Sequence, residues 1–161
     1  MTPAANIEAV VFNLGGETFA LPVGTVREIL DYREAFQMPQ GPRWLAGLID
    51  VRGDAIPMID LRVRLGLPAA TVGPMTRILV VSVQCDERLL TLGVIVDRVL
   101  DVATFTADAI ETTPDIGVRW RSDYIDGIVR SGGGFVVLLS PARIFEAEDG
   151  AIDFSALTAA A

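Results

Sequence analysis

Short runs of apolar residues, continuous or alternating with polar ones, recur along the chain and are separated by turn residues. Residues 8–32 contain one such run, the turn letters LGGE, a second run and an apolar segment that ends in Leu-Asp. Residues 44–65 contain a run, a glycine-bearing turn over 51–54, another run and the start of a helix. Runs of this length and period are typical of β-strands. The pattern predicts an all-β, or mainly β, protein.

The same arrangement of apolar runs and turns occurs twice in the sequence. Residues 8–32 can be laid without a gap on residues 78–102, an offset of 70. Residues 44–65 match residues 124–145 at an offset of 80, with Gly47 on Gly127 and Gly53 on Gly133. We interpret this as an internal duplication. It predicts two similar lobes of about five short strands each, small enough to close as barrels and so remove their exposed edges.

Helices are expected only where the second pattern ends. Asp60 precedes LRVRL and Ser140 precedes PARIF, and both residue types favour a helix N-cap. Pro141 then stands at the first helical position, where its missing N–H costs nothing. Gly66 and Pro68 end the first helix.

These boundaries divide the chain into a domain over residues 8–146 and two tails. The expected segments are an N-terminal tail 1–7, a first lobe of about 8–66, a Pro- and Gly-rich linker 66–75, a second lobe of about 76–146 and a C-terminal tail 147–161. A longer stretch, residues 103–123, is expected as an insertion in the second lobe alone.

Composition excludes several classes of function. The chain has no histidine and one cysteine, Cys85, so neither a cysteine zinc cage nor a disulfide framework is expected, and we predict no metal and no cofactor. Its 13 basic residues, all arginine, against 21 acids give a net charge of -8, which opposes binding to nucleic acid or to an anionic membrane. Trp44 and Trp120 are interpreted as packing anchors. The partners are expected to be proteins and the location cytoplasmic.

A more specific signal is the stretch LIDVRGDAIPMIDLR, residues 48–62. With FNLGGETFALPVGTVREIL, LGVIVDRVLDV and YIDGIV in the same order, it resembles the chemotaxis coupling proteins, the CheW-like adaptor family, over roughly residues 8–146. The family pattern is N-x-R-G-x-x-x-P-x-x-D-L-R. Asp50 stands where the family usually has Asn.

The resemblance implies two intertwined, five-stranded, SH3-like barrels packed side by side, without catalytic activity. Such adaptors couple the cytoplasmic tip of a chemoreceptor to the regulatory domain of a histidine kinase. Carried over by position, the residues expected at or near the receptor groove between the lobes are Arg52, Val26, Glu28, Ile78, Gly93 and Val99. Those expected near the barrel end that meets the kinase are Gly47, Gly53, Leu45 and Leu48.

The duplication offers an internal control for the charged residues of this stretch. Gly53 recurs as Gly133 and so belongs to the fold, whereas Arg52 falls on Gly132. We therefore expect Arg52 to serve a partner, offering its planar set of donors to the receptor. Along a strand Asp50 would share a face with Arg52 and would orient it.

Two alternatives remain open from the sequence. One is a CheW-like scaffold of a receptor array that serves pili or biofilm. The other is a small carboxylate-dependent hydrolase on a barrel fold, which would need convergent acids of raised pKa in a concave site.

Overall fold

The fold described here is that of a computed structural model, which describes residues 6–39, 41–68, 71–85, 88–111 and 124–144. Strands dominate it. They are β1 (Ile7–Leu14), β2 (Glu17–Pro22), β3 (Val26–Asp31), β4 (Leu45–Val51), β5 (Asp54–Asp60), β6 (Arg77–Cys85), β7 (Arg88–Val96), β8 (Arg98–Phe105), β9 (Ile110–Glu111), β10 (Ile125–Ser131) and β11 (Gly134–Leu139).

The helices are short, as the sequence predicts. They are α1 (Leu61–Arg64), α2 (Pro141–Ile144) and the 3-10 turns η1 (Val23–Thr25) and η2 (Ala107–Ala109). The Asp60 carboxylate caps α1 by accepting a hydrogen bond from the backbone N–H of Arg62, at 3.1 Å. The all-β prediction is confirmed.

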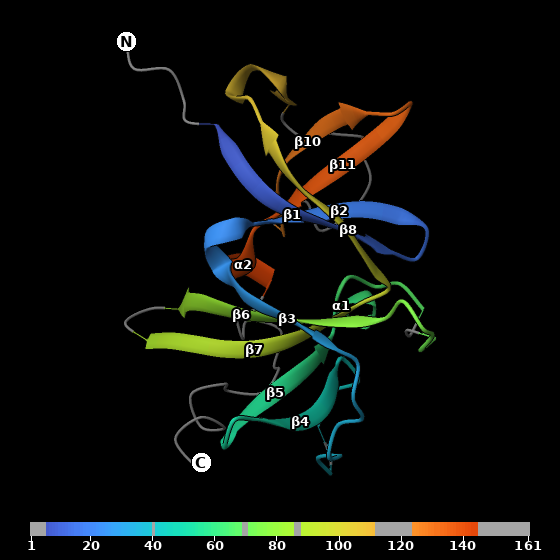
Figure 1. Ribbon diagram of the computed structural model, residues 1–161, viewed down its shortest axis with the longest axis vertical. Helices are drawn as coiled ribbons and strands as arrows, with labels where there is room; N and C mark the ends of the chain where they lie inside the picture. The colour runs from blue at the N-terminus through green and yellow to red at the C-terminus, as the bar shows by residue number, and fades with distance from the viewer. Residues whose placement is uncertain (1–5, 40, 69–70, 86–87, 112–123, 145–161) are drawn as a thin grey trace.

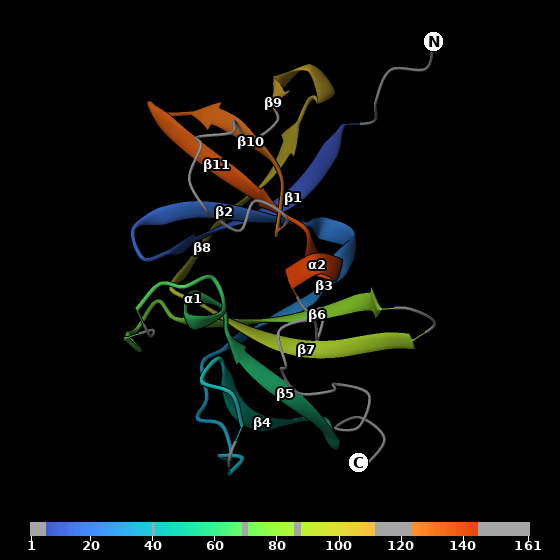
Figure 2. The ribbon, with the colours of Figure 1, turned by 180° about the vertical axis from the view of Figure 1, so that it is seen from behind.

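The strands form two sheets, one in each lobe of the molecule (Figure 1). Lobe A has the order β8-β1-β2-β11-β10-β9, and lobe B has the order β3-β6-β7-β5-β4. Figure 2 shows the lobes from behind, with α1 and α2 between them. The two-lobe architecture that the resemblance implied is therefore present.

Each lobe takes strands from both halves of the sequence. β1 and β2 belong to lobe A together with β8 to β11, while β6 and β7 belong to lobe B with β3 to β5. The chain crosses between the lobes through η1, and again at Asp97 between β7 and β8. The lobes are thus intertwined, and neither sheet corresponds to one continuous half of the chain.

The duplication accounts for this exchange. If β1, β2 and β3 are matched with β6, β7 and β8, and β4 and β5 with β10 and β11, the strand order of lobe B becomes that of lobe A, with β9 added. The offset of 80 holds residue for residue. Both hairpins carry a bulge at the same place, between Leu45 and Gly47 and between Ile125 and Gly127.

The offset of 70 is wrong at the level of single residues. Val10, Phe12 and Leu14 of β1 share the central core with Leu79, Val81 and Val83 of β6, which is an offset of 69. The gap-free alignment instead placed Val10 on Val80, whose side chain lies inside lobe B. A shift of one residue moves a side chain to the opposite face of a strand. From β2 onward the offset is 73. Ala20 of β2 pairs with Leu138 of β11, and Gly93 of β7 pairs with Met58 of β5, the residue that matches Leu138 in the other copy.

Three apolar clusters make up the core. The largest lies between the sheets and includes Phe12, Leu21, Ile59, Leu92 and Leu139. A second fills lobe A around Val11, Val129 and Leu138, and a third fills lobe B around Ile49, Met58, Ile78 and Val80. Strands with one face in the shared cluster and the other in a lobe cluster are apolar on both faces, which explains the continuous runs of the sequence.

The outer edges of β4 and β10 are covered in the same way. Phe36 exchanges two backbone hydrogen bonds with Leu48, at 2.7 and 2.9 Å, and β9 pairs with β10. Residues 103–111 therefore have a counterpart in the first copy, which corrects the expected insertion. They complete β8 and form η2 and β9. Residues 112–123, the rest of that insertion, lie outside the described residues.

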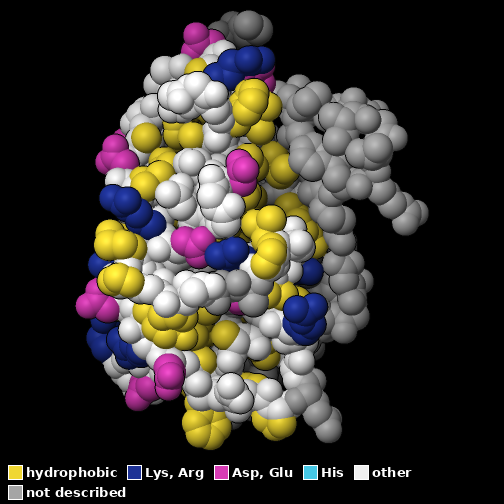
Figure 3. Space-filling view, turned by 90° about the vertical axis from the view of Figure 1, so that its right-hand side faces the viewer, with side chains coloured by type: hydrophobic (Ala, Val, Ile, Leu, Met, Phe, Trp, Pro, Cys, Tyr) yellow, Lys and Arg dark blue, Asp and Glu magenta, His cyan; other side chains and the backbone are white. Residues whose placement is uncertain are grey.

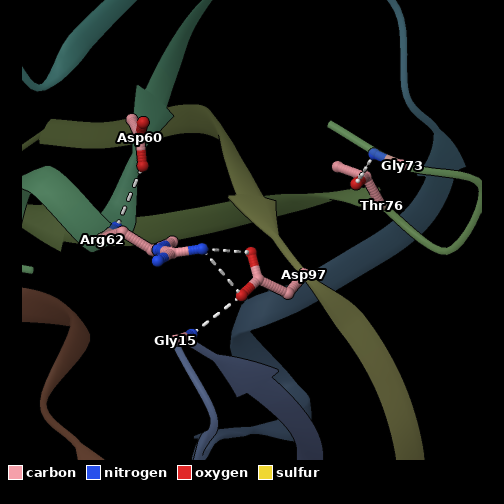
Figure 4. A network of polar contacts seen from close by, with 6 residues as sticks. All are labelled: Gly15, Asp60, Arg62, Gly73, Thr76 and Asp97. Atoms are coloured by element: carbon pink, nitrogen blue, oxygen red, sulfur yellow. Dashed lines mark hydrogen bonds and ion pairs between the residues drawn. The ribbon is translucent and has the colours of Figure 1, made fainter. Parts of the chain in front are cut away.

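A polar network ties the two lobes together at the second crossing (Figure 4). The Asp97 carboxylate accepts hydrogen bonds from Arg62 Nη1 of α1, at 3.1 and 3.4 Å, and from the backbone N–H of Gly15 in the β1–β2 turn, at 2.8 Å. The Asp97 backbone N–H donates to the Asn13 carbonyl, at 3.0 Å. Asp97 thus binds lobe A and lobe B at once.

Candidate functional site

A charged pair lies at the open end of lobe B, over a surface hollow of about 490 Å³. Glu28 of β3 and Arg52 of the β4–β5 turn form a bidentate ion pair, in which two guanidinium nitrogens donate to the two carboxylate oxygens. The Nη1–Oε1 distance is 3.1 Å. The hollow continues to Val80 and Ile56 of the lobe interior and to Leu89 and Thr91 of β7.

The backbone of Arg52 has an uncommon conformation. Its φ is 51° and that of Gly53 is 89°, the pair of positive values that a two-residue hairpin turn of type I′ requires. The expected placement of Arg52 on the strand face beside Asp50 is therefore wrong, because β4 ends at Val51. In the duplicated hairpin, Gly132 and Gly133 take φ values of 57° and 81°.

Asp50 supports the turn instead of orienting Arg52. Its Oδ1 accepts a hydrogen bond from the backbone N–H of Gly53, at 2.8 Å. The Asp50 carbonyl accepts from Arg33 Nη1, at 2.7 Å. Since the turn uses the Asp50 side chain only as an acceptor, an Asn oxygen would serve equally well there. The departure from the family pattern leaves this turn intact.

The ion pair shifts the pKa values of both partners. Hydrogen bonding from Arg52 lowers the pKa of Glu28 below its usual value of 4.5, with a smaller opposing effect from loss of solvent around the carboxylate. The same hydrogen bond raises the pKa of Arg52. Both groups are therefore charged at neutral pH.

The face drawn in Figure 3 shows arginines, carboxylates and apolar side chains interspersed. On the face drawn in Figure 3, yellow hydrophobic side chains emerge in several separate places between charged ones. Within the described part of the chain, no group of three or more His, Cys, Asp or Glu side chains is arranged to hold a metal ion. No helix among those residues has the length and apolar character needed to cross a membrane.

Comparison with known proteins assigns a family to this architecture. The family model described as the CheW-like domain matches residues 8–149. The chain is 30% identical over 142 residues to the chemotaxis protein CheW of Rhizobium meliloti, covering 88% of this chain and 89% of that protein. It is 35% identical over 98 residues to Protein PilI of Pseudomonas aeruginosa, covering 60% of this chain and 52% of that protein.

A solved structure agrees with these matches. The crystal structure of the scaffolding protein TtCheW from Thermoanaerobacter tengcongensis superposes with a TM-score of 0.77 at 26% identity, covering 92% of this chain and 91% of that one. This chain belongs to the CheW-like family. Membership supports a scaffold or adaptor of chemotaxis signalling as its broad function.

The residues expected at a receptor groove between the lobes of this CheW-like chain do not all lie between the lobes, but fall into three places. Arg52 and Glu28 form the ion pair at the end of lobe B. Val26 and Val99 are half-buried against the shared core, each at the strand that follows a crossing between lobes. Ile78 and Gly93 lie inside lobe B, where a Cβ added to Gly93 would lie 3.1 Å from Ile78 Cγ2. Neither of these two residues lines the hollow beside Arg52.

The residues expected at the kinase end are mostly structural in their immediate contacts. A Cβ at Gly47 would lie 2.2 Å from the Phe36 carbonyl oxygen, so the backbone that approaches Gly47 is the chain's own. Leu45 is buried in the shared core, and Gly53 is an exposed turn residue. Leu48 is half-buried beside Phe36, whose side chain is 78% exposed.

Sequence reasoning missed Asp97 and Arg62. At the correct offsets, Asp97 falls on Gly24 and Arg62 on Ala142, so both charges occur in one copy only. That asymmetry is the signal that could have revealed them. The offset of 70 hid it, because it aligned Asp97 with another charged residue, Arg27.

Proposed function

We propose that this chain is a scaffold that couples the cytoplasmic tip of a chemoreceptor to a histidine kinase through protein contacts, with no chemical step of its own. The observation that carries the proposal is the conformation of Arg52. An arginine held at positive φ, where the duplicated turn uses Gly132, costs about 1 kcal/mol or more. The turn does not need that side chain, which supports a role toward a partner.

The receptor side of the scaffold is the end of lobe B. Arg52 is 72% exposed, so its remaining N–H groups are available to backbone carbonyls or a carboxylate of a receptor helix. Glu28 holds the guanidinium in place by two hydrogen bonds. Val26 and Val99 add apolar surface beside the shared core, while Ile78 and Gly93 fix the position of the strands beneath.

The kinase side is the edge of lobe B formed by β4. Leu48 and the exposed ring of Phe36 offer an apolar contact there, and Gly47 lets the two backbones approach. Leu45 anchors the strand in the core and Gly53 ends it. The kinase and the receptor would then bind different surfaces of lobe B.

The test is Arg52→Ala in a reconstituted signalling complex. We expect loss of receptor-stimulated kinase activity, nearly unchanged kinase affinity, and an unfolding midpoint within about 5 °C of the parent, because an exposed ion pair stabilises by about 0–1 kcal/mol. The matched control is Arg130→Ala. Arg130 is also 72% exposed and also pairs with a glutamate, Glu111, at 2.8 Å, but it lies in lobe A.

The proposal fails if Arg52→Ala supports normal receptor control of the kinase. It also fails if Arg130→Ala abolishes that control as completely, since the effect would then reflect loss of any exposed arginine. Thermal unfolding, kinase affinity and kinase activity are measured on the same preparations.

A second candidate keeps the scaffold role and changes the pathway. The observation behind it is that one relative is named Protein PilI and not a chemotaxis protein, so the chain resembles CheW-like proteins of more than one name. Deleting the gene in its host and scoring swimming toward attractants against surface motility and biofilm formation separates the two. Unimpaired chemotaxis in the deletion strain would favour the second candidate.

A further inference from the structure

The hollow under Arg52 has a counterpart at the open end of lobe A. This second hollow, of about 420 Å³, is lined by residues of β1, β2, β8, β10 and β11. Val11, Thr18 and Val136 line it at the places that Val80, Thr91 and Ile56 hold in lobe B. The duplication has therefore produced the same concave surface twice.

The two hollows differ in their charged and apolar groups. Asp101 stands in lobe A where Glu28 stands in lobe B, so the acid is kept, but Gly132 replaces Arg52. Leu100 takes the place of Arg27 and is 44% exposed. Phe135 takes the place of Ala55 and is 48% exposed. The lobe A hollow thus has a carboxylate and two large apolar side chains, and lacks the arginine.

The nearest arginine of the same hairpin does not fill this gap. Arg130 Nε donates to Glu111 Oε2, at 2.8 Å, and its guanidinium lies over the Phe135 ring, 5.3 Å from the centroid. Among the residues that the structure describes, no cation pairs with Asp101. One of its oxygens, Oδ1, accepts from the backbone N–H of Val102, at 2.8 Å.

We propose that the lobe A hollow binds an arginine-bearing segment of a partner protein, with the arginine between aliphatic residues. Its guanidinium would occupy the place beside Asp101 that Arg52 occupies beside Glu28, while its neighbours pack on Leu100 and Phe135. Arginine suits the place because a planar guanidinium can pair with both oxygens of a carboxylate. This inference is independent of the proposed function, since it concerns the other lobe.

The net charge of the chain favours a foreign partner over a second copy. Each copy carries a formal charge of -8, so two copies repel each other, whereas a basic segment is attracted. Burial of the two apolar side chains would add to the charge interaction.

The first measurement is an NMR titration of the isotope-labelled full chain with the peptide acetyl-Leu-Val-Arg-Val-Leu-amide. The expected shifts concentrate at Leu100, Asp101, Gly132 and Phe135. A second peptide, with the neutral isostere citrulline in place of arginine, should bind about tenfold more weakly, because hydrogen bonds to charged groups are the stronger ones.

Two variants test the same geometry from the protein side. Gly132→Arg supplies an internal arginine and should weaken binding of the arginine peptide at least about tenfold. It should fold, because the matching turn of lobe B holds Arg52 at a similar positive φ, and a Cβ at Gly132 meets nothing within 4 Å. Gly132→Asn is the control: asparagine tolerates positive φ, and binding should be kept.

Asp101→Asn removes the charge but keeps a side-chain oxygen that can accept from the Val102 backbone N–H, and it should weaken binding to a similar extent. The proposal is overturned if both peptides bind equally, if Asp101→Asn binds like the parent, or if the shifts map to the Arg52 hollow. Sedimentation velocity of the chain alone supplies the last check. Self-association that Gly132→Arg abolishes would make a second copy the occupant and would overturn the assignment to a partner.

Discussion

At the scale of single residues, the duplicated hairpins separate what the fold needs from what it tolerates. Both turns require positive φ at two successive positions, and three of the four residues there are glycine. Arg52 is the exception. Its φ of 51° is the left-handed region, which L-residues with a Cβ adopt at a cost. A residue kept against its backbone preference, and paired with Glu28, is a candidate for function.

Arg52→Gly is therefore expected to leave the protein at least as stable as the parent. Both Arg52→Gly and Arg52→Ala lose the ion pair, but only the alanine variant keeps the strained φ. The glycine variant should therefore be about 1 kcal/mol more stable than Arg52→Ala. Urea unfolding of the three proteins measures the order. If the glycine variant were the least stable, the arginine side chain would be serving the fold.

At the scale of elements, the edge of β4 depends on a close approach between two backbones. Gly47 has a φ of 142°, and the Phe36 carbonyl fills the place where its Cβ would lie. Gly127 repeats the arrangement beneath β9, where an added Cβ would lie 2.7 Å from Ile110 Cγ2. The glycine matched between the copies is thus explained by the covering of a sheet edge.

Gly47→Ala should destabilise the chain by about 3 kcal/mol or more, because the methyl group must displace backbone and the residue must keep an unfavourable φ. The control is Gly24→Ala, whose added Cβ meets nothing within 4 Å and which should change stability by less than about 0.5 kcal/mol. Chemical denaturation compares them. Equal stability of the two variants would mean that the Phe36 segment moves aside freely.

A change in the kinase affinity of Gly47→Ala would not by itself identify a kinase contact. Weaker kinase binding by Gly47→Ala would reflect the disturbed edge as well as any contact, so Leu48 and Phe36 are the better positions for mapping that surface.

At the scale of the whole molecule, exchange of strands makes each lobe dependent on both halves of the chain. Lobe B needs β6 and β7 between β3 and β5, and lobe A needs β1 and β2 between β8 and β11. The largest apolar cluster also draws residues from both sheets. Folding should therefore be a property of the complete chain.

Fragments 1–72 and 73–161 are expected to be unfolded when separate and to form the native sheets when mixed. The cut lies in an exposed connection, where Val72 is half-exposed, and it interrupts no strand. Circular dichroism and amide NMR spectra of each fragment and of the mixture decide the matter. A cooperative unfolding transition in fragment 1–72 alone would contradict it.

The hydrogen bonds of Asp97 to Arg62 and Gly15 should help to hold the two lobes together and so stabilise the fold. Asp97→Ala leaves Arg62 and the Gly15 N–H without their acceptor in a site where the Arg62 side chain is 16% exposed, and should cost about 2 kcal/mol. Asp31→Ala is the control, since Asp31 pairs with Arg77 on the surface and its side chain is 95% exposed. It should change stability by less than about 1 kcal/mol.

Hydrogen exchange adds a reading specific to the interface between lobes. Exchange should rise at the β1–β2 turn around Gly15 in Asp97→Ala and stay unchanged in Asp31→Ala. Unchanged exchange and stability in Asp97→Ala would show that apolar packing alone holds the lobes together.

The sequence by itself determined the elements, the duplication and the family. Alternation of apolar residues marked the strands, Asp60 marked the start of a helix, and the pairing of Gly53 with Gly133 marked both turns. These features are local, because they follow from side-chain period, capping and backbone freedom. They could be read without knowing which strand lies beside which.

Only the tertiary structure decided the register of the first repeat, the exchange of strands and the partners of the charged residues. β1 and β6 are apolar on both faces, so their sequences do not show which face meets the other lobe, and a one-residue slip went unnoticed. Arg52 pairs with Glu28, which is 24 positions away in the sequence, and Arg62 pairs with Asp97, which is 35 positions away. Such contacts depend on how non-neighbouring strands pack, which local pattern does not encode.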